Sequence, residues 1–251
     1  MSRHAFRWAL AVCLLFAAEA AAAEKVVVGL DRYYNAETRN GQPYHYAWED
    51  TKSSGYSEFG KLLEGLGAKT ASIDRAASAE SLAGVDLYII VDPDTPKETP
   101  KPNYIDDKAI AAVVDWVKAG GILVLLNNNV GETEFEHLNK LAGRFGIRFN
   151  EDTRFGLDAD PKKLQMHSFP KHPFFAGVEK LHMRSVCTLK VDPTAEVVYR
   201  FQGDNIMALS RCGDGLVFAL GDPWGYNEYI DFFDNRKCLT NLFRRLIEQA
   251  K

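Results

Sequence analysis

The apolar residues between positions 25 and 145 follow two alternating patterns. Short apolar runs, rich in β-branched residues, predict strands at residues 25–30, 68–73, 86–91 and 122–126. Longer segments carry apolar residues at helical spacing and predict helices at residues 57–66, 105–118 and 134–145. The resulting order of strand, helix, strand, strand, helix, strand and helix favours a three-layer α/β fold, in which a mainly parallel sheet has helices on both faces.

The pattern changes after residue 150. Residues 150–182 are irregular, and the short apolar runs that follow predict strands at residues 185–190, 195–201, 206–210 and 216–220. Turn residues separate these runs, so we expect a C-terminal antiparallel β-meander that extends the sheet or packs beside it. A helical pattern from about residue 235 ends the chain. Residues 24–251 are therefore expected to form one α/β domain.

The first 23 residues have the features of a targeting segment. Arg3 and Arg7 precede an apolar stretch at residues 8–18, which is too short to span a membrane, and alanines occupy positions 21–23. We therefore expect a cleaved signal peptide, a secreted or periplasmic location, and no membrane association after cleavage.

The charge of the chain narrows the range of partners. The 251 residues carry a formal net charge of −4 at pH 7, and the basic residues form no stripe. Binding of nucleic acid depends on clustered lysine and arginine side chains, so we expect no nucleic-acid partner.

Three cysteines follow the predicted signal peptide. Cys187 and Cys212 lie on neighbouring predicted strands, and an oxidising compartment would permit a disulfide, so the sequence favours a bridge between these two. Cys238 is interpreted as a buried residue of the last helix.

A dense group of polar and aromatic residues follows the last predicted strand. The apolar run at residues 216–220 leads into a stretch that contains Asp222, Trp224, Tyr226, Asn227 and Glu228. In open α/β sheets, ligands bind at the carboxyl ends of the strands. This stretch is therefore a candidate ligand site, although a rigid turn over packed aromatic rings would use several of the same residues.

Other strand ends and one long loop are expected to converge on this stretch. They contribute Asp31, Arg32, Tyr33, Tyr34 and Asn35 after the first strand, Asp92 and Asp94 after the third, Asn127, Asn128 and Asn129 after the fourth, and His45 and Trp48 from the loop. Aromatic faces beside amides and carboxylates suit a sugar, and Arg32 could hold a uronate carboxylate through two hydrogen bonds. Asp222, Glu228 and Asp92 are the candidate acids or bases.

Each candidate also has a structural interpretation. Asp92 and Asp222 precede prolines and could shape turns. The asparagines at positions 127–129 could cap the next helix, and Tyr33 and Tyr34 could pack beneath the long loop. His45 is more typical of a structural histidine than of a ligand.

The sequence lacks the motifs of several common active sites. No two histidines have metal-ligand spacing, the turn after the first strand lacks phosphate-binding glycines, and Gly-x-Ser-x-Gly is absent. We therefore expect no metal and no cofactor. Carboxylate pairs such as Asp92 with Asp222 are available, so an enzyme, if this is one, would be a hydrolase acting on saccharides.

A family resemblance rests on four stretches, at residues 31–35, 86–94, 114–125 and 221–229. Together they resemble the class I glutamine amidotransferase-like superfamily, in the branch without the amidotransferase catalytic residues. More narrowly, they resemble the α/β module associated with bacterial unsaturated rhamnogalacturonyl hydrolases. The resemblance implies a flavodoxin-like three-layer fold and a saccharide context. It implies no amidotransferase activity, because asparagines stand where the catalytic cysteine would be expected.

Three functions follow as hypotheses. The first is binding or processing of uronate-containing, pectin-derived oligosaccharides of the rhamnogalacturonan type, which predicts an open, aromatic-lined cleft at the strand ends. The second is a non-catalytic interaction module that docks onto a partner carbohydrate-active enzyme, which predicts that these aromatics are buried or form a flat patch. The third is a small-molecule hydrolase, which predicts a carboxylate or His45 with a strongly perturbed pKa in a cleft.

Overall fold

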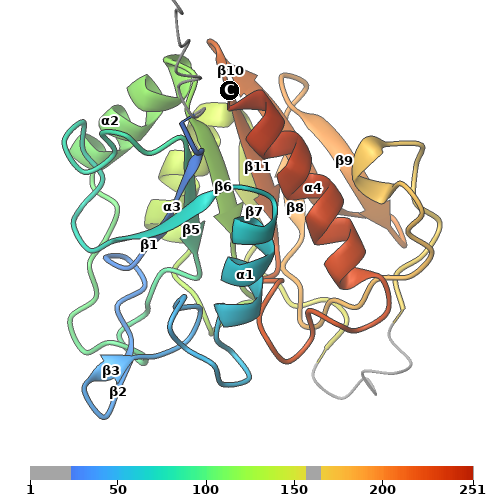
Figure 1. The fold of residues 1–251 in the computed structure, drawn as a ribbon, viewed down its shortest axis with the longest axis horizontal. Helices are drawn as coiled ribbons and strands as arrows, with labels where there is room; N and C mark the ends of the chain where they lie inside the picture. Colours follow the sequence, from blue (N-terminus) through green and yellow to red (C-terminus); the bar gives the residue numbers. More distant parts are fainter. Residues whose placement is uncertain (1–23, 157–164, 251) are drawn as a thin grey trace, which may run out of the picture.

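A seven-stranded sheet forms the centre of the computed structural model, which describes residues 24–156 and 165–250 (Figure 1). Five of its strands are parallel: β4 (Lys69–Ile73), β1 (Val27–Asp31), β5 (Leu87–Val91), β6 (Ile122–Leu126) and β11 (Gly215–Leu220). Two antiparallel strands, β10 (Asp204–Cys212) and β9 (Glu196–Phe201), extend it beyond β11. The predicted α/β class and its C-terminal antiparallel strands are therefore confirmed.

The central strands are buried along their whole length. Every residue of β5 and β6 is buried, which fits their unbroken apolar sequences. Parallel strands are covered by helices on both faces and so carry continuous rather than alternating apolar residues.

Two pairs of helices cover the two faces of the sheet. On one face lie α1 (Ser57–Gly65) and α4 (Asn235–Gln249), which cross the front of the sheet in Figure 1. On the other face lie α2 (Asp107–Lys118) and α3 (Glu136–Ala142). Asp106 caps α2, because its side chain accepts a hydrogen bond from the Ala109 amide at 2.8 Å.

Several short elements differ from the sequence prediction. The segment predicted as a strand at residues 185–190 contributes only β8 (Leu189–Val191), which pairs with β7 (Ile147–Phe149) in a separate two-stranded sheet. The long loop after β1 contains a small hairpin of β2 (Thr38–Arg39) and β3 (Gln42–Pro43). Two 3-10 turns, η1 (Gly143–Phe145) and η2 (Pro173–Phe175), complete the described elements. These pieces are too short to produce a periodic signal in the sequence.

The predicted disulfide is wrong. Cys187 and Cys212 are both free cysteines. Cys212 pairs with Gly215 at the beginning of β11, whereas Cys187 donates its amide to the carbonyl of Gly221, just beyond the end of β11. A six-residue strand separates the two positions by about 20 Å, far beyond disulfide reach.

The predicted signal peptide, residues 1–23, lies outside the described residues. Within the described residues, no helix has both the length and the apolar character needed to cross a membrane.

The order of the parallel strands creates a topological switch point. In chain order the five strands are β1, β4, β5, β6 and β11, and in space they run β4-β1-β5-β6-β11, which is the 2-1-3-4-5 order of doubly wound sheets. The chain leaves β1 toward α1 on one face and leaves β5 toward α2 on the other. The loops that follow β1 and β5 therefore lead to opposite faces of the sheet, and doubly wound sheets place their ligands at such a point.

Gly221, directly after β11, allows the chain to approach the backbone of Cys187 closely. A Cβ atom on this residue would lie 1.7 Å from the carbonyl oxygen of Cys187. The Cys187 amide also donates to the Gly221 carbonyl at 2.9 Å, so the two backbones are held together.

We expect Gly221→Ala to destabilise the protein because the added methyl group must displace backbone. Such overpacking costs about 3 kcal/mol or more, which would lower Tm by roughly 10 °C. Gly65→Ala is the control, since Gly65 is exposed at the end of α1 and nothing lies near its Cβ position. Its Tm should be unchanged or slightly raised. Differential scanning calorimetry of both variants measures this, and equal melting temperatures would contradict the close packing at Gly221.

Candidate functional site

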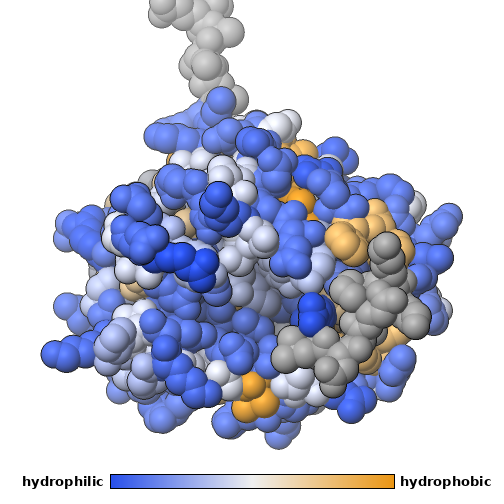
Figure 2. All heavy atoms as spheres, turned by 90° about the horizontal axis from the view of Figure 1, so that it is seen from below, coloured by the Kyte–Doolittle hydropathy of each residue, from blue (hydrophilic) through white to orange (hydrophobic). Residues whose placement is uncertain are grey.

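Three carboxyl groups and one amide lie at the carboxyl edge of the sheet. Asp31, Asp92, Asn127 and Asp222 end or directly follow β1, β5, β6 and β11, which are successive neighbours in the sheet, with Gly221 preceding Asp222. All four side chains are buried. The surface over this edge, seen from below in Figure 2, is largely hydrophilic. The convergence expected from the sequence is therefore present, but it lies beneath the surface.

Asp31 organises the turn that follows β1. Its carboxyl accepts hydrogen bonds from the Tyr34 amide at 2.8 Å and from the Tyr88 hydroxyl at 3.0 Å. Burial raises the pKa of Asp31 to about 7, although these hydrogen bonds act in the opposite direction.

Asp222 fastens the turn that follows β11. Its carboxyl accepts from the Trp224 amide at 2.7 Å and from the Arg184 amide at 3.1 Å. Burial raises the pKa of Asp222 to about 7. Glu228, the second candidate acid of this stretch, is exposed, and its amide donates to the Ser53 carbonyl at 2.8 Å. The two carboxyl groups thus lie in different environments, one inside the turn and one in solvent.

Asp92 is the most constrained of the candidate acids. Its backbone adopts a left-handed conformation with φ of 45°, which is uncommon for a residue other than glycine. Burial, followed by the negative charge of Glu98, raises the pKa of Asp92 well above its ordinary value. Asn128 donates to one carboxyl oxygen at 3.4 Å, while the other is buried without a hydrogen-bond partner.

The aromatic residues that were predicted to stack on a sugar are instead buried in the core or packed against it. Trp224 and Tyr34 are only 2% and 1% exposed. Trp48 donates its indole N–H to the Ala71 carbonyl at 3.1 Å and packs against α1. Tyr33 and Tyr226 are half-buried. The sequence could not distinguish a ring that stacks on a ligand from a ring that packs on a helix, and here the second use dominates.

The polar contacts of Arg32, Asn35 and His45 are made within the protein. Arg32 donates to the Asn35 side-chain oxygen at 3.0 Å and to the His45 carbonyl at 3.1 Å. Asn35 in turn donates to the Asp92 carbonyl at 2.7 Å. The His45 ring lies 3.2 Å from a Glu37 carboxylate oxygen, and burial lowers the pKa of His45 to about 4. These residues therefore join the loop after β1 to the end of β5.

The remaining predicted amides also hold backbone or neighbouring side chains. Asn127 accepts a hydrogen bond from the Thr133 hydroxyl at 2.7 Å. The Asn227 side chain accepts from the Glu58 amide at 3.0 Å, in the first turn of α1, and donates to the Lys52 carbonyl at 2.8 Å. Asn227 therefore serves as a remote cap for α1.

An acidic group at the same edge contains Asp94, which was a candidate from the sequence, and two residues that were not, Glu37 and Glu98. Carboxylate oxygens of Glu37, Asp94 and Glu98 lie within 4.8 Å of one another, so this group could hold a metal ion. Burial raises the pKa of Glu37 to about 7 and also raises the pKa of Glu98. No sequence signal marked Glu37 and Glu98, because 61 positions separate them and neither ends a strand.

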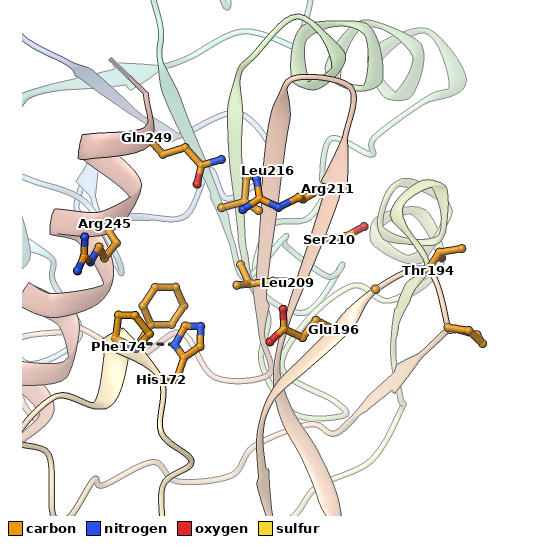
Figure 3. A pocket seen from close by; sticks show the side chains of 13 residues that line it. His172, Phe174, Thr194, Glu196, Leu209, Ser210, Arg211, Leu216, Arg245 and Gln249 are labelled. Carbon is orange, nitrogen blue, oxygen red and sulfur yellow. Dashed lines mark hydrogen bonds between the residues drawn. The ribbon is translucent and has the colours of Figure 1, made fainter.

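A second candidate site lies on the α4 face of the sheet, toward the other end of β11 (Figure 3). It is a cavity of about 670 Å³ between α4, η2 and the strands β9 and β10. We call it the α4 cavity. Its apolar lining includes Phe174, Leu209 and Leu216, and its polar lining includes His172, Glu196, Ser210, Arg211, Arg245 and Gln249. These residues come from five elements, namely η2 with its N-cap, β9, β10, β11 and α4, and they form no motif in the sequence.

His172 stands at the η2 side of the α4 cavity. Its ring nitrogen accepts the Phe174 amide at 3.3 Å, and its ring meets the Phe174 ring edge-on at 4.2 Å. Burial lowers the pKa of His172, while the charge of Glu196 acts to raise it. The side chain of Arg245 forms an exposed pair with Glu248 at 3.1 Å, a kind of contact that contributes little to stability.

The fold and its edge define a doubly wound α/β domain with buried carboxyl groups at its strand ends. Residues 49–243 match the family described as a domain of unknown function, DUF4350, and the chain belongs to that family. Among curated proteins, none matches this chain significantly.

Solved structures share the fold at low sequence identity. The mmIFT52 N-terminal domain is 18% identical with a TM-score of 0.69, over 88% of this chain and 96% of that one. The cytoplasmic protein STM1381 from Salmonella typhimurium LT2 is 13% identical with a TM-score of 0.61, over 88% and 98% of the two chains. The cytoplasmic protein STM3548 from Salmonella typhimurium is 16% identical with a TM-score of 0.57, over 88% and 97%. At these identities the likeness concerns the fold alone.

These comparisons correct two predictions. The resemblance to glutamine amidotransferase-like and rhamnogalacturonyl hydrolase modules is wrong, because the matching family is DUF4350 and the structural neighbours are the three proteins above. The predicted secreted or periplasmic location is also wrong by the same comparisons, since two of these neighbours are described as cytoplasmic proteins.

We expect Asp222→Asn to change how stability depends on pH. In the folded protein Asp222 keeps its proton up to a pKa of about 7, whereas the unfolded chain releases it near the ordinary value of 3.8. The wild type therefore loses stability as pH rises from about 4 to 7, and the asparagine does not titrate. Relative to wild type, the variant should gain up to about 4 kcal/mol over this window.

Urea unfolding of both proteins between pH 4 and 8 measures this difference. The variant carries a constant penalty because its amide group cannot accept both the Trp224 and Arg184 amides. Two curves that run parallel across the whole pH range would contradict the raised pKa of Asp222.

Proposed function

We propose that this chain is a non-enzymatic binding domain for uronate-containing oligosaccharides, with the α4 cavity as its binding site. The observation that carries the proposal is that Arg211 and Arg245 line the same cavity as the apolar side chains of Phe174, Leu209 and Leu216. Figure 3 shows these side chains around a common space, with the arginines contributed by β10 and α4.

The chemistry of the cavity suits an acidic sugar. A guanidinium group presents paired N–H donors that match a carboxylate in two parallel hydrogen bonds. The apolar C–H faces of a sugar ring suit the wall formed by Phe174 and Leu209, while Glu196 and Gln249 offer partners for hydroxyl groups. The volume of about 670 Å³ falls within the range typical of small-molecule sites.

The lining of the cavity favours binding over cleavage. Glycoside hydrolysis generally needs two carboxyl groups on opposite sides of the scissile bond. Among the residues that line the α4 cavity, Glu196 is the one carboxylate. The proposal therefore includes no hydrolytic step.

A second candidate function is a non-catalytic interaction module that docks onto a partner carbohydrate-active enzyme. The burial of Trp224 and Tyr34 favours it, because these rings are not available to stack on a sugar at the strand ends. The two functions differ in their expected ligand, so one titration separates them.

The test is isothermal titration calorimetry of the protein with digalacturonate and trigalacturonate. We expect Arg211→Gln and Arg245→Gln each to weaken binding by about tenfold, as expected for loss of one charge-assisted hydrogen bond. Arg244→Gln is the matched control, since Arg244 is exposed on the same helix but does not line the cavity. Neutral galactobiose should bind much more weakly than digalacturonate.

Absence of binding at millimolar oligosaccharide, or equal affinity of the wild type and both cavity variants, would contradict the proposal. The interaction module would then be the better supported function.

A further inference from the structure

The acidic group lies at the switch point, where the loops after β1 and β5 meet. Glu37 belongs to the loop between β1 and α1, while Asp94 and Glu98 belong to the loop between β5 and α2. Carboxylate oxygens of the three residues lie within 4.8 Å of one another. The switch point is where doubly wound sheets place their ligands, and it is separate from the α4 cavity.

Asp94 is buried and incompletely paired. Only 1% of the residue is exposed. One carboxylate oxygen accepts from the Ala36 amide at 2.9 Å and from the Thr99 hydroxyl at 2.5 Å. The other is buried and receives no hydrogen bond. A buried oxygen without a partner loses its hydration and gains nothing in return, so its position needs a separate explanation.

The other two carboxylates are also held in place. One oxygen of Glu98 accepts from the Thr95 amide at 2.7 Å and from the Thr95 hydroxyl at 2.8 Å, which leaves the second oxygen free to bind elsewhere. One oxygen of Glu37 lies 3.2 Å from the His45 ring. Each carboxylate thus has one oxygen engaged with the protein, and the group is organised before any ligand arrives.

The guanidinium group of Arg32, close to the three carboxylates, donates its hydrogen bonds to uncharged oxygens. Arg32 donates to the Asn35 side chain and to the backbone carbonyls of His45 and Glu37. Within residues 24–156 and 165–250, no lysine or arginine forms an ion pair with Glu37, Asp94 or Glu98. Three carboxylates this close repel one another unless a cation or protons neutralise them.

We propose that Glu37, Asp94 and Glu98 bind a divalent cation, with calcium preferred over magnesium. Carboxylate oxygens are the ligands that hard cations prefer. Calcium accepts six to eight oxygens in flexible geometry, whereas magnesium demands near-ideal octahedral geometry and usually takes only one or two carboxylates. The three carboxylate oxygens lie within 4.8 Å of one another, about twice a calcium–oxygen distance of roughly 2.4 Å, so one calcium ion can contact all three. Water molecules complete its coordination.

The cation would add a link between the loops after β1 and β5, which the hydrogen bond from the Ala36 amide to Asp94 already joins. Glu37 directly precedes the small β2–β3 hairpin of the first long loop, and Asp94 lies shortly after the end of the buried strand β5. A shared ion would hold the loop against the edge of the sheet and stabilise the folded state in proportion to its occupancy.

The test uses the full chain, stripped with EDTA and titrated with calcium chloride or magnesium chloride at constant ionic strength. We expect calorimetry to show one calcium ion per chain, and Tm to rise by about 5 °C or more at a calcium concentration a hundredfold above Kd. Magnesium should bind at least tenfold more weakly.

Two variants remove a ligand without removing a structural contact. Glu98→Gln keeps an oxygen that can accept from Thr95, as in a capping box, and Glu37→Gln keeps a partner for His45. Each should weaken calcium binding by tenfold or more while Tm in EDTA stays close to wild type. Glu151→Gln, at an exposed glutamate, is the control and should bind as wild type.

Three results would overturn the proposal. The first is no heat and no Tm shift with millimolar calcium, and the second is wild-type affinity in both ligand variants. The third, equal or tighter binding of magnesium, would overturn the preference for calcium. None of these measurements depends on the α4 cavity, so the outcome for oligosaccharide binding stays separate.

Discussion

The burial of β5 and β6 on both faces is the constraint on which the rest of this structure depends. Helices cover these strands from either side, so their side chains must be apolar along the whole length. Polar chemistry can appear only where the strands end. Asp92 and Asn127 stand at those ends, and each is then held by hydrogen bonds because the edge itself is buried. The proposed cation ligands therefore lie in the loops beyond this edge.

The sequence predicted the elements better than their contacts. Unbroken apolar runs located β6 to the residue, and helical spacing located α1, α2 and α4 within a few positions. The convergence of strand ends followed from the parallel order. The burial of Trp224 did not, because composition does not distinguish a ring that packs beneath a turn from one that lies on a ligand. The bridge between Cys187 and Cys212 failed for a related reason: neighbouring strands were assumed, but the residues lie at opposite ends of β11.

The two candidate sites differ in how they are assembled. The α4 cavity draws on residues from η2, β9, β10, β11 and α4, so its chemistry exists only when the antiparallel extension has docked on the last helix. The acidic group of Glu37, Asp94 and Glu98 needs only the loops after β1 and β5. The family match covers residues 49–243, so Glu37 and Arg245 both fall outside it. Relatives that share only the matched segment need not have either charge, so the two proposed sites can vary independently among them.

The remote cap on α1 has a consequence for the order of folding. Tyr56, at the N-cap of α1, makes no side-chain capping hydrogen bond, and the first turn of the helix is instead satisfied by Asn227, which comes about 170 positions later. The parallel strand β11 likewise enters the sheet beside β6 after the intervening segments have been made. During synthesis, α1 therefore lacks its cap and the edge of β6 lacks its partner strand until the second half of the chain has been made. Contacts of such long sequence separation slow folding, so this domain should complete its structure only after the ribosome has released nearly all of it.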